Sequence, residues 1–390
     1  MEVEVVAPEG AIRYAAAALR IGMGRQVNGR RAVAAALALP LLSLLTACGS
    51  NASKPISASP LAHVSPTAKV VVGARVPRTL PSFQGGVIVY ADGNDPGLLS
   101  DAERLLDHLV AIRVNSVALA FPLYQTSWTS TDVHADAVKT PGDTFIQGFI
   151  AAAHERDLAV LLRPLIDDTP LMNAGHWRGQ LLPSSAGAWY ASYKAMMLKY
   201  AGLAQAEGGE VLDIGTELSS LQTNTAAWTE MITAIRASYA GQLTYSSNWD
   251  VDYPAFGSAL DFASVDAFYP LSAPNNASVA QIVSAWGAWT GKLTSIKSSL
   301  GKPVVLTELG TTSEPNSYQS PYKWTHGAKV SLEAQRRYYA ASCQALKSLV
   351  GGMYWWVYYT NWFDKVTPET DPGYQPAGKP AEQQITACYS

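Results

Sequence analysis

The chain has 390 residues, 48% of them hydrophobic and 15% charged, and a formal net charge of −3. This composition is that of a globular protein able to bury a sizeable core. The small negative charge, and the lack of a basic run after the first thirty or so residues, argue against nucleic-acid binding. Eleven Trp and nineteen Tyr against eight Phe favour rings with a polar edge, which suit stacking on polar ligands, although large cores also use them.

The N-terminus has the pattern of an export signal. Arg25, Arg30 and Arg31 precede an apolar stretch over residues 32–45, which leads into Cys48. A basic region, a short apolar region and a cleavage site of small residues are typical of a secretory signal peptide. The apolar stretch is too short to span a membrane comfortably as a helix.

The end of this signal indicates lipidation. Residues 45–48, Leu-Thr-Ala-Cys, resemble the lipobox of bacterial lipoproteins, in which the cysteine becomes the lipidated first residue. We therefore expect a signal peptide over residues 1–48, a lipid on Cys48, and an extracytoplasmic bacterial lipoprotein that meets the membrane through this anchor only. An ordinary signal peptide with a chance cysteine is the alternative. Met23 is a second candidate start, because it would give a more usual basic region.

A tether and one domain follow the signal. Residues 49–80 are rich in Ser, Ala and Pro and lack hydrophobic periodicity, which predicts a flexible linker. Residues 81–390 then form a stretch of about 310 residues, which suits a single α/β barrel. We expect this domain to be a monomer.

From residue 85 onward, short apolar runs alternate with amphipathic helical stretches. The runs are continuous, as expected of parallel strands covered on both faces. Predicted strands cover residues 86–90, 116–121, 159–164, 211–215, 243–246, 262–267, 303–307 and 352–358. Predicted helices cover residues 101–112, 144–155, 188–205, 225–239, 279–300 and 331–349.

This order of elements predicts an α/β fold, a closed (β/α)8 TIM barrel. A doubly wound open sheet rarely has eight such units, and no glycine-rich nucleotide loop follows the first strand. The region after Trp362, rich in Pro, Gly and Asp, is expected to be a terminal loop that wraps the barrel.

Two glutamates directly follow the fourth and seventh predicted strands. Active sites of this fold lie at the C-terminal ends of the strands, so Glu217 and Glu308 should lie at the barrel mouth. A carboxylate there is costly to desolvate unless it is paired or used. Either glutamate alone could be a rim charge. Two on opposite sides of one barrel suit cleavage of a glycosidic bond, which needs one proton donor and one nucleophile or base.

The segments around these glutamates resemble those of glycoside hydrolase family 113, a β-mannanase family in the clan of retaining barrel glycosidases. The resemblance implies that Glu217 is the general acid/base and Glu308 the nucleophile. Many members of the wider clan have Asn before the acid/base, where this chain has Thr216, so the usual contact with the sugar 2-hydroxyl is missing or made otherwise. The motifs that carry the resemblance, in the family's order, are residues 163–167, 177–179, 214–218, 307–310 and 352–356.

Three polar residues near strand ends are candidates for substrate binding. Arg163, at the end of the third strand, could hold a carboxylate or a sugar hydroxyl, or form a structural ion pair. Tyr269 follows the sixth strand, where the clan resemblance implies a hydrogen bond to the nucleophile; a rim aromatic is the alternative. Asn248 follows the fifth strand and should also reach the mouth.

Three tryptophans are candidates for stacking on sugar rings. Trp177 lies in the long loop after the third strand, where simple loop packing is the alternative. Trp355 and Trp356 are neighbours on the eighth strand and point to opposite faces, so one can face the site while the other belongs to the core.

The cysteines and histidines indicate a disulfide and no metal. If Cys48 carries lipid, Cys343 and Cys388 remain as an even pair outside the cytosol, which suits a bond that pins the C-terminal tail; two buried free thiols are the alternative. The six His residues lack a metal-ligand spacing, and we expect neither a metal nor another cofactor.

The expected reaction is retaining hydrolysis of a β-linked polysaccharide or oligosaccharide. Glu308 attacks the anomeric carbon while Glu217 protonates the leaving oxygen, and Glu217 then activates water. This requires a raised pKa for Glu217 and a normal or low one for Glu308. The choice of β-1,4-mannan rests on the resemblance alone. A surface glycan-binding lipoprotein without turnover and a transglycosylase on the same scaffold are the alternatives.

Overall fold

The computed structural model describes residues 75–324, 329–361 and 363–390. The predicted signal peptide, Cys48 and nearly all of the tether lie outside the described residues. Within them, no helix is long and apolar enough to cross a membrane.

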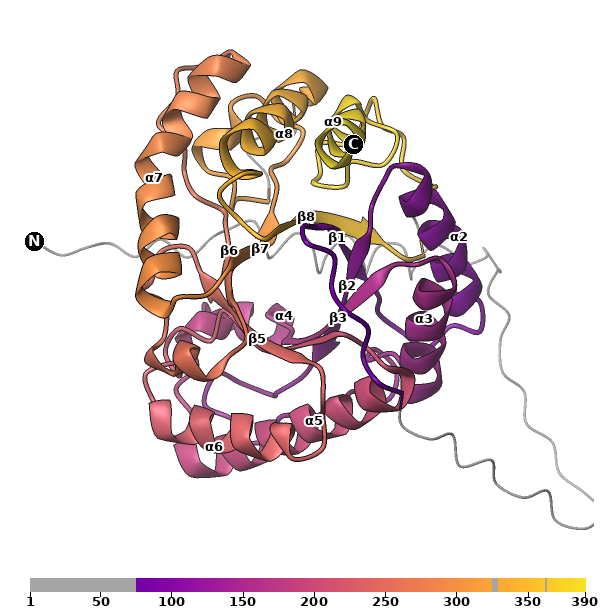
Figure 1. Ribbon diagram of the computed structural model, residues 1–390, viewed down its shortest axis with the longest axis vertical. Helices are drawn as coiled ribbons and strands as arrows, with labels where there is room; N and C mark the ends of the chain where they lie inside the picture. The colour runs from indigo at the N-terminus through magenta and orange to yellow at the C-terminus, as the bar shows by residue number, and fades with distance from the viewer. Residues whose placement is uncertain (1–74, 325–328, 362) are drawn as a thin grey trace, which may run out of the picture.

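Eight parallel strands close into one barrel, in which each strand pairs with the next and β8 pairs with β1. Figure 1 looks along this ring of strands, with the helices outside it. The predicted TIM barrel is confirmed, and every predicted strand overlaps an observed one. The strands are β1 (Gln84–Tyr90), β2 (Ser116–Leu123), β3 (Ala159–Ile166), β4 (Val211–Thr216), β5 (Gln242–Asn248), β6 (Ala263–Asp266), β7 (Val304–Leu309) and β8 (Gly352–Tyr359).

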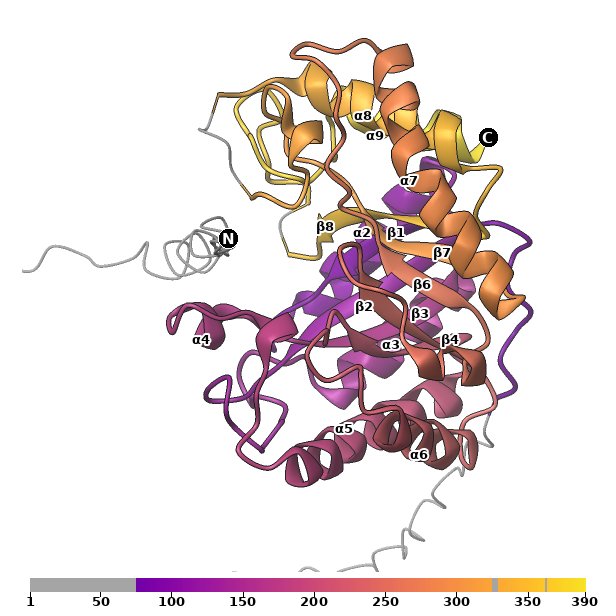
Figure 2. The ribbon, with the colours of Figure 1, turned by 90° about the vertical axis from the view of Figure 1, so that its left-hand side faces the viewer.

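Long helices follow every strand except β5, which is followed only by the 3-10 helix η2 (Ala255–Ala259). The short helix α4 (Thr169–Met172) projects from one end of the barrel in Figure 2. The outer helices are α2 (Leu98–Ala111), α3 (Asp143–Glu155), α5 (Ala186–Glu207), α6 (Thr225–Arg236), α7 (Val279–Leu300), α8 (Leu332–Leu346) and α9 (Pro380–Tyr389); η1 (Arg178–Gln180) and η3 (Ser317–Gln319) are further 3-10 turns.

Local sequence sets the ends of the longest helices. Ser278 and Gln281 form a capping box at the start of α7, in which each side chain bonds the other residue's backbone N–H. Gly301 ends the same helix with a φ of 63°, a left-handed conformation that glycine adopts without a steric penalty. Ser185 caps α5, and Gly208 ends it in the same way with a φ of 76°.

The apolar side chains form two cores because successive residues of a strand face opposite sides. The larger core lies between the strands and the helices. The smaller one lies inside the barrel and includes Ile88, Leu161, Val211 and Val305. Toward the mouth the interior becomes polar, with buried Arg163, Asp213, Ser246, Asp266 and Thr307.

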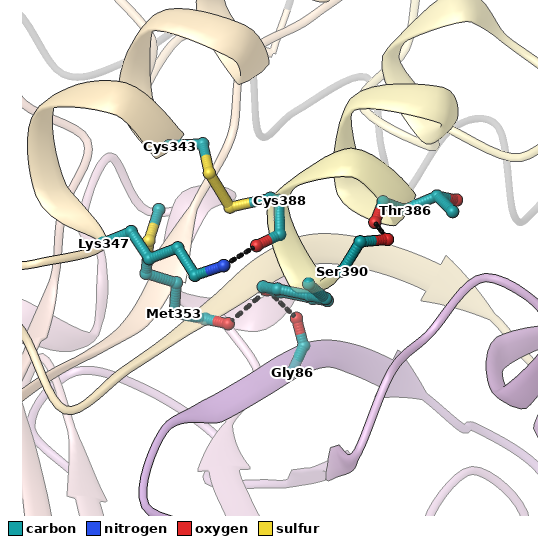
Figure 3. Close-up of a disulfide and its surroundings, with 8 residues drawn as sticks. Gly86, Cys343, Lys347, Met353, Thr386, Cys388 and Ser390 are labelled. Atoms are coloured by element: carbon teal, nitrogen blue, oxygen red, sulfur yellow. Dashed lines mark hydrogen bonds between the residues drawn. A yellow bond between two sulfur atoms is a disulfide. The ribbon is translucent and has the colours of Figure 1, made fainter.

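The C-terminal region contains a helix, so the expected terminal loop is only part of its structure. Helix α9 is joined to α8 by a disulfide between Cys343 and Cys388, whose Cα atoms are 5.9 Å apart (Figure 3). The hydroxyl of Tyr389 donates hydrogen bonds to the carbonyl oxygens of Gly86 on β1 (2.9 Å) and Met353 on β8 (2.6 Å). The tail thus covers the junction between the first and last strands.

Candidate active site

Each of the two glutamates lies at the end of a strand that has one extra residue relative to its neighbour: Glu217 directly follows β4, and Glu308 is the penultimate residue of β7. Three residue steps on β4, from Asp213 to Thr216, match two steps on β5. Two steps on β7, from Leu306 to Glu308, match one step on β6. Such a β-bulge re-aims the side chains around it and is common beside active sites.

The backbone of Glu217 is held in an unusual conformation. Its φ is 54°, in the left-handed region that costs a non-glycine residue about 1–2 kcal/mol. Its N–H donates to the carbonyl oxygen of Ser246 on β5 at 2.8 Å, which fixes the turn. Strain of this kind persists at functional sites where the surrounding structure enforces it.

Glu308 binds directly to Arg163 across the barrel. Its Oε1 accepts a hydrogen bond from Nη2 of Arg163 at 2.6 Å, and its side chain is 7% exposed. Thr307 also faces the interior, two residues after Val305, and its hydroxyl donates to Asp266 at 3.0 Å. The structure therefore places Arg163 as a carboxylate partner, one of the roles expected of it.

Arg163 is shared by three carboxylates and is itself fully buried. Besides Glu308, Nη2 donates to Asp266 at 2.7 Å, while Nη1 lies 3.5 Å from Asp213. Nη1 also donates to the hydroxyl of Ser246 at 3.2 Å. One guanidinium cannot neutralise three carboxylates, so this network carries excess negative charge unless a proton is held among its acids.

The pKa values of all three acids are raised, in each case chiefly by burial. Burial raises the pKa of Asp213 to about 6, although Arg163 opposes the rise. Burial also raises the pKa of Asp266, again against Arg163. Burial and the charges of Asp266 and Glu217 raise the pKa of Glu308, which Arg163 and Arg178 counteract. The expectation of a normal or low pKa for Glu308 is therefore wrong for the free site, because burial and then the neighbouring carboxylates raise it.

Glu217 has a different partner, Arg178. The guanidinium Nε of Arg178 donates to Oε2 of Glu217 at 3.2 Å, and its Nη2 lies 3.2 Å from Asp168. Nη1 also donates to the carbonyl oxygen of Ile166 at the end of β3 (2.8 Å). Burial raises the pKa of Glu217 to about 7, against the lowering effect of Arg178. This rise is the one expected of a general acid.

Tyr269 does not bind Glu308, contrary to the expectation. Its ring is buried on the outer side of the barrel, stacked on Trp289 of α7 at 4.7 Å and edge-on to Trp286 at 6.0 Å. Its hydroxyl has no hydrogen-bond partner among the described residues. The chain leaves β6 so that Phe268, and not Tyr269, packs with the interior core.

The two tryptophans of β8 point to opposite faces of the strand, as alternation predicts, and Trp356 is the one that faces the barrel interior. Trp356 packs with the interior core, near Tyr90 (6.5 Å between ring centroids) and Trp324 (6.2 Å). Trp355 is fully buried on the outer side and stacks on Tyr339 of α8 at 4.1 Å. Trp355 is therefore a core residue and is withdrawn as a substrate contact.

The remaining predicted residues lie beside the glutamates' strands. Asn248 ends β5, is buried, and pairs in register with Asp266 on β6. Its side-chain oxygen accepts from the backbone N–H of Trp249 at 2.9 Å. Trp177 is half-buried and directly precedes Arg178, which contacts Glu217.

Several functional residues were not singled out from the sequence. Asp213 and Asp266 had a signal, since acids inside apolar strand runs are rarely buried unless paired. Arg178 lies within a quoted motif, but its contact with Glu217 joins a loop after β3 to the end of β4, which no local pattern reveals. Within the described residues, no group of three or more His, Cys, Asp or Glu side chains is placed to hold a metal ion.

A closed barrel with a glutamate at the end of β4 and another at the end of β7, each paired with an arginine, is the arrangement of a barrel glycoside hydrolase. The model of Glycoside Hydrolase Family 113 matches residues 98–379. The chain therefore belongs to this family.

Solved structures agree with this assignment. The GH113 β-mannanase AaManA from Alicyclobacillus acidocaldarius, solved in complex with ManMIm, is 25% identical, with a TM-score of 0.69 over 79% of this chain and 97% of that one. A GH113 β-1,4-mannanase is 24% identical, with a TM-score of 0.70 over 80% and 99%, and shares the fold. The Ruminococcus gnavus β-glucuronidase shares the fold at 12% identity, with a TM-score of 0.52 over 80% and 50%. No curated protein matches this chain significantly in sequence.

Proposed function

We propose that this glycoside hydrolase is a retaining β-mannanase, which cleaves β-1,4-mannan or manno-oligosaccharides by double displacement. The observation that carries the mechanism is the unequal pairing of the two glutamates. Glu308 lies 2.6 Å from the guanidinium of Arg163, whereas Glu217 lies 3.2 Å from that of Arg178. The mannan substrate is supported by the family and by the β-mannanase activity named for its solved members.

In the first step, a proton and a negative charge must reside on different glutamates. The pKa values of both glutamates are raised, so the free site holds a proton near neutral pH. The shorter contact with Arg163 favours the negative charge on Glu308 and leaves the proton on Glu217. Glu308 attacks the anomeric carbon, and Glu217 gives its proton to the leaving glycosidic oxygen. The bond to the leaving sugar breaks as the bond to Glu308 forms.

In the second step, Arg178 stabilises the ionised Glu217, and Arg163 binds the carboxylate of Glu308 as it is released. Glu217, now ionised and stabilised by Arg178, removes a proton from water, and the resulting oxygen nucleophile attacks the anomeric carbon. Glu308 leaves as a carboxylate that Arg163 receives at hydrogen-bond distance. Asp266 accepts from the same Nη2, and Asp213 lies beside Nη1, so the guanidinium keeps its position through both steps.

Assays on mannan and on an aryl β-mannoside test this function. We expect turnover of both by the wild type, with loss of at least about 10³-fold in kcat for Glu308→Ala. Binding without turnover in the wild type would instead establish a glycan-binding protein. Transfer to an added sugar in preference to water, measured from the products at high acceptor concentration, would establish a transglycosylase.

We also propose that the enzyme is exported and anchored through Cys48, which lies outside the described residues. The disulfide between Cys343 and Cys388 supports a location outside the cytosol, because such bonds persist in oxidising compartments. Detergent partitioning of wild type and Cys48→Ser tests the anchor. The wild type should partition into the detergent phase and the variant into the aqueous phase. Equal partitioning of the two would contradict a lipid anchor on Cys48.

A further inference from the structure

Asp213 is an acid of the barrel interior with no exposed surface through which it could contact a substrate. It lies on β4, the strand that leads into Glu217. A carboxylate buried in this way is costly unless its oxygens accept hydrogen bonds. The partners of Asp213 therefore indicate what it does in the site.

The two oxygens of Asp213 bind both sides of the bulge in β4. Oδ1 accepts from the backbone N–H of Gly215 on β4 and from that of Ser246 on β5, each at 3.3 Å. Oδ2 accepts from the hydroxyl of Ser246. These bonds lie where β4 and β5 lose register, between Asp213 and Thr216. The carboxylate thus joins the two strands across the irregular step.

Ser246 also holds the turn that presents Glu217. Its carbonyl oxygen accepts from the N–H of Glu217 at 2.8 Å, while its own N–H and hydroxyl donate to Asp213. Asp213 is therefore linked to the backbone of Glu217 through one residue. The φ of Glu217 is 54°, a conformation that a non-glycine residue keeps only where its surroundings enforce it. Loss of this support should let the turn relax.

On the outer side of the barrel, close packing holds the same bulge. A Cβ on Gly215 would lie 2.8 Å from the ring of Tyr245 and 2.9 Å from that of Trp228. The hydroxyl of Tyr193 donates to the carbonyl oxygen of the preceding residue at 3.1 Å. These contacts fix the outer face of the bulge, and the Asp213 carboxylate fixes the inner face.

Arg163 depends less on Asp213 than the bulge does. Its Nη1 lies 3.5 Å from Asp213. Its Nη2 donates at shorter distances to Asp266 (2.7 Å) and Glu308 (2.6 Å). Two carboxylates would therefore still hold the guanidinium if Asp213 were removed. Removal should thus disturb Glu217 more than Glu308.

We propose that Asp213 is a positioning residue for the general acid/base, because its carboxylate closes the bulge in β4 and so holds the Glu217 turn. This inference rests on the proposed function and adds a residue to its mechanism. The bulge requires the hydrogen-bond acceptor of Asp213 and not its negative charge. A misplacement of about 1 Å can cost roughly 100-fold in rate, even when the altered residue never meets the substrate.

The test uses two substrates that need the acid to different extents. The sugar released from β-1,4-mannohexaose must be protonated as it leaves, whereas dinitrophenolate leaves a dinitrophenyl β-mannobioside without a proton. We expect Asp213→Ala to lower kcat/KM roughly 100-fold on the hexaose and less than about fivefold on the aryl substrate. Asp213→Val, with an apolar side chain of similar size, takes its place if the alanine variant does not fold.

Two further variants separate the acceptor from other effects. Asp213→Asn keeps an acceptor oxygen for the two backbone N–H groups, so it should restore most of the rate on the hexaose. Thr244→Val is the matched control, because it removes a buried hydroxyl from the register partner of Asp213 without touching the turn. It should leave the rates on both substrates unchanged.

Sodium azide gives a second readout of the acid/base. Azide needs no base to attack the glycosyl-enzyme, so its nitrogen bonds to the anomeric carbon, Glu308 leaves as a carboxylate, and a glycosyl azide is released. Because the second step of Asp213→Ala lacks a well-placed Glu217, azide should raise its kcat on the aryl substrate and leave that of the wild type unchanged. No rise in the variant would contradict the proposal.

Equal losses on the two substrates, or no loss on either, would overturn the positioning role. A loss in Asp213→Asn as large as that in Asp213→Ala would do the same, since the charge would then matter. If the wild type cleaves neither substrate, the proposed mannanase function has failed, and crystal structures of wild type and variant decide the role separately. A Glu217 backbone that leaves the left-handed conformation supports it; an unchanged turn rules it out.

Discussion

Arg163 on β3 reaches across the barrel interior to place its guanidinium 2.6 Å from the carboxylate of Glu308 on β7. The same nitrogen lies 2.7 Å from Asp266 on β6. The charge of Glu308, the proposed nucleophile, is therefore set in part by a competition among acids for one buried cation. The protonation of Glu308 therefore depends on Arg163 and Asp266, which are both fully buried.

Asp266→Asn should shift the acidic limb of the pH profile to lower pH. The negative charge of Asp266 raises the pKa of Glu308, so its removal lowers that pKa and lets Glu308 ionise in more acidic solution. The amide keeps the shape of the side chain and its proximity to Arg163. Measuring kcat/KM against pH on an aryl β-mannoside checks the shift. An acidic limb that stays in place or moves to higher pH would contradict the assigned competition.

Arg178→Gln should move the alkaline limb to higher pH. Activity of the wild type should fall above about pH 7, as Glu217 loses the proton that it must donate. Arg178 lowers the pKa of Glu217, so removing its charge raises that pKa and extends activity into more alkaline solution, at a lower maximal rate. An alkaline limb that is unchanged or displaced downward would remove Arg178 as the partner of the acid/base.

Substitutions of Trp355 and Trp356 should have different effects. Trp355→Ala removes a buried ring that stacks on Tyr339, and we expect the free energy of unfolding to fall by about 3–5 kcal/mol. Trp356→Ala should instead lower kcat/KM by more than roughly tenfold, since its ring faces the barrel mouth. Denaturant titrations and steady-state assays of both variants check this. A larger loss of activity in Trp355→Ala, after correction for the folded fraction, would reverse the assignment.

Removal of the disulfide should destabilise the protein and spare catalysis. Cys343 and Cys388 close a loop with a sequence separation of 45. Losing such a link should lower the free energy of unfolding by about 4 kcal/mol on the chain-entropy model. The double variant Cys343→Ser/Cys388→Ser, compared with wild type by denaturant unfolding, gives the difference. Because the bond joins α8 to α9 and contacts neither glutamate, kcat should change little; a large loss of kcat in folded variant would show that the tail shapes the site.

The barrel could be predicted from the sequence because its signals are local. Continuous apolar runs marked all eight strands, and the positions of Glu217 and Glu308 followed from where two of those runs end. Helix α9 was missed because its ten residues follow a loop with several Pro and Gly residues and were grouped with that loop. The opposite facing of Trp355 and Trp356 followed from alternation alone.

What could not be predicted depends on register and on contacts distant in sequence. Which tryptophan faces inward is set by how β8 seats against its neighbours, including an extra residue between Trp355 and Tyr358 relative to β1. The prediction for Tyr269 was wrong because the path of the chain after β6 determines whether its ring faces the barrel interior or the outer helices. Arg178 and Glu217 are 39 positions apart in the sequence, and no local pattern around either residue predicts their contact.

The initial anomer of the product tests the central claim most directly. Double displacement by Glu308, with Glu217 as acid/base, inverts the anomeric carbon twice and so leaves its configuration unchanged. Proton NMR of mannohexaose hydrolysis, recorded before mutarotation, should therefore show the β-anomer forming first. First appearance of the α-anomer would show a single displacement by water and would contradict the role given to Glu308.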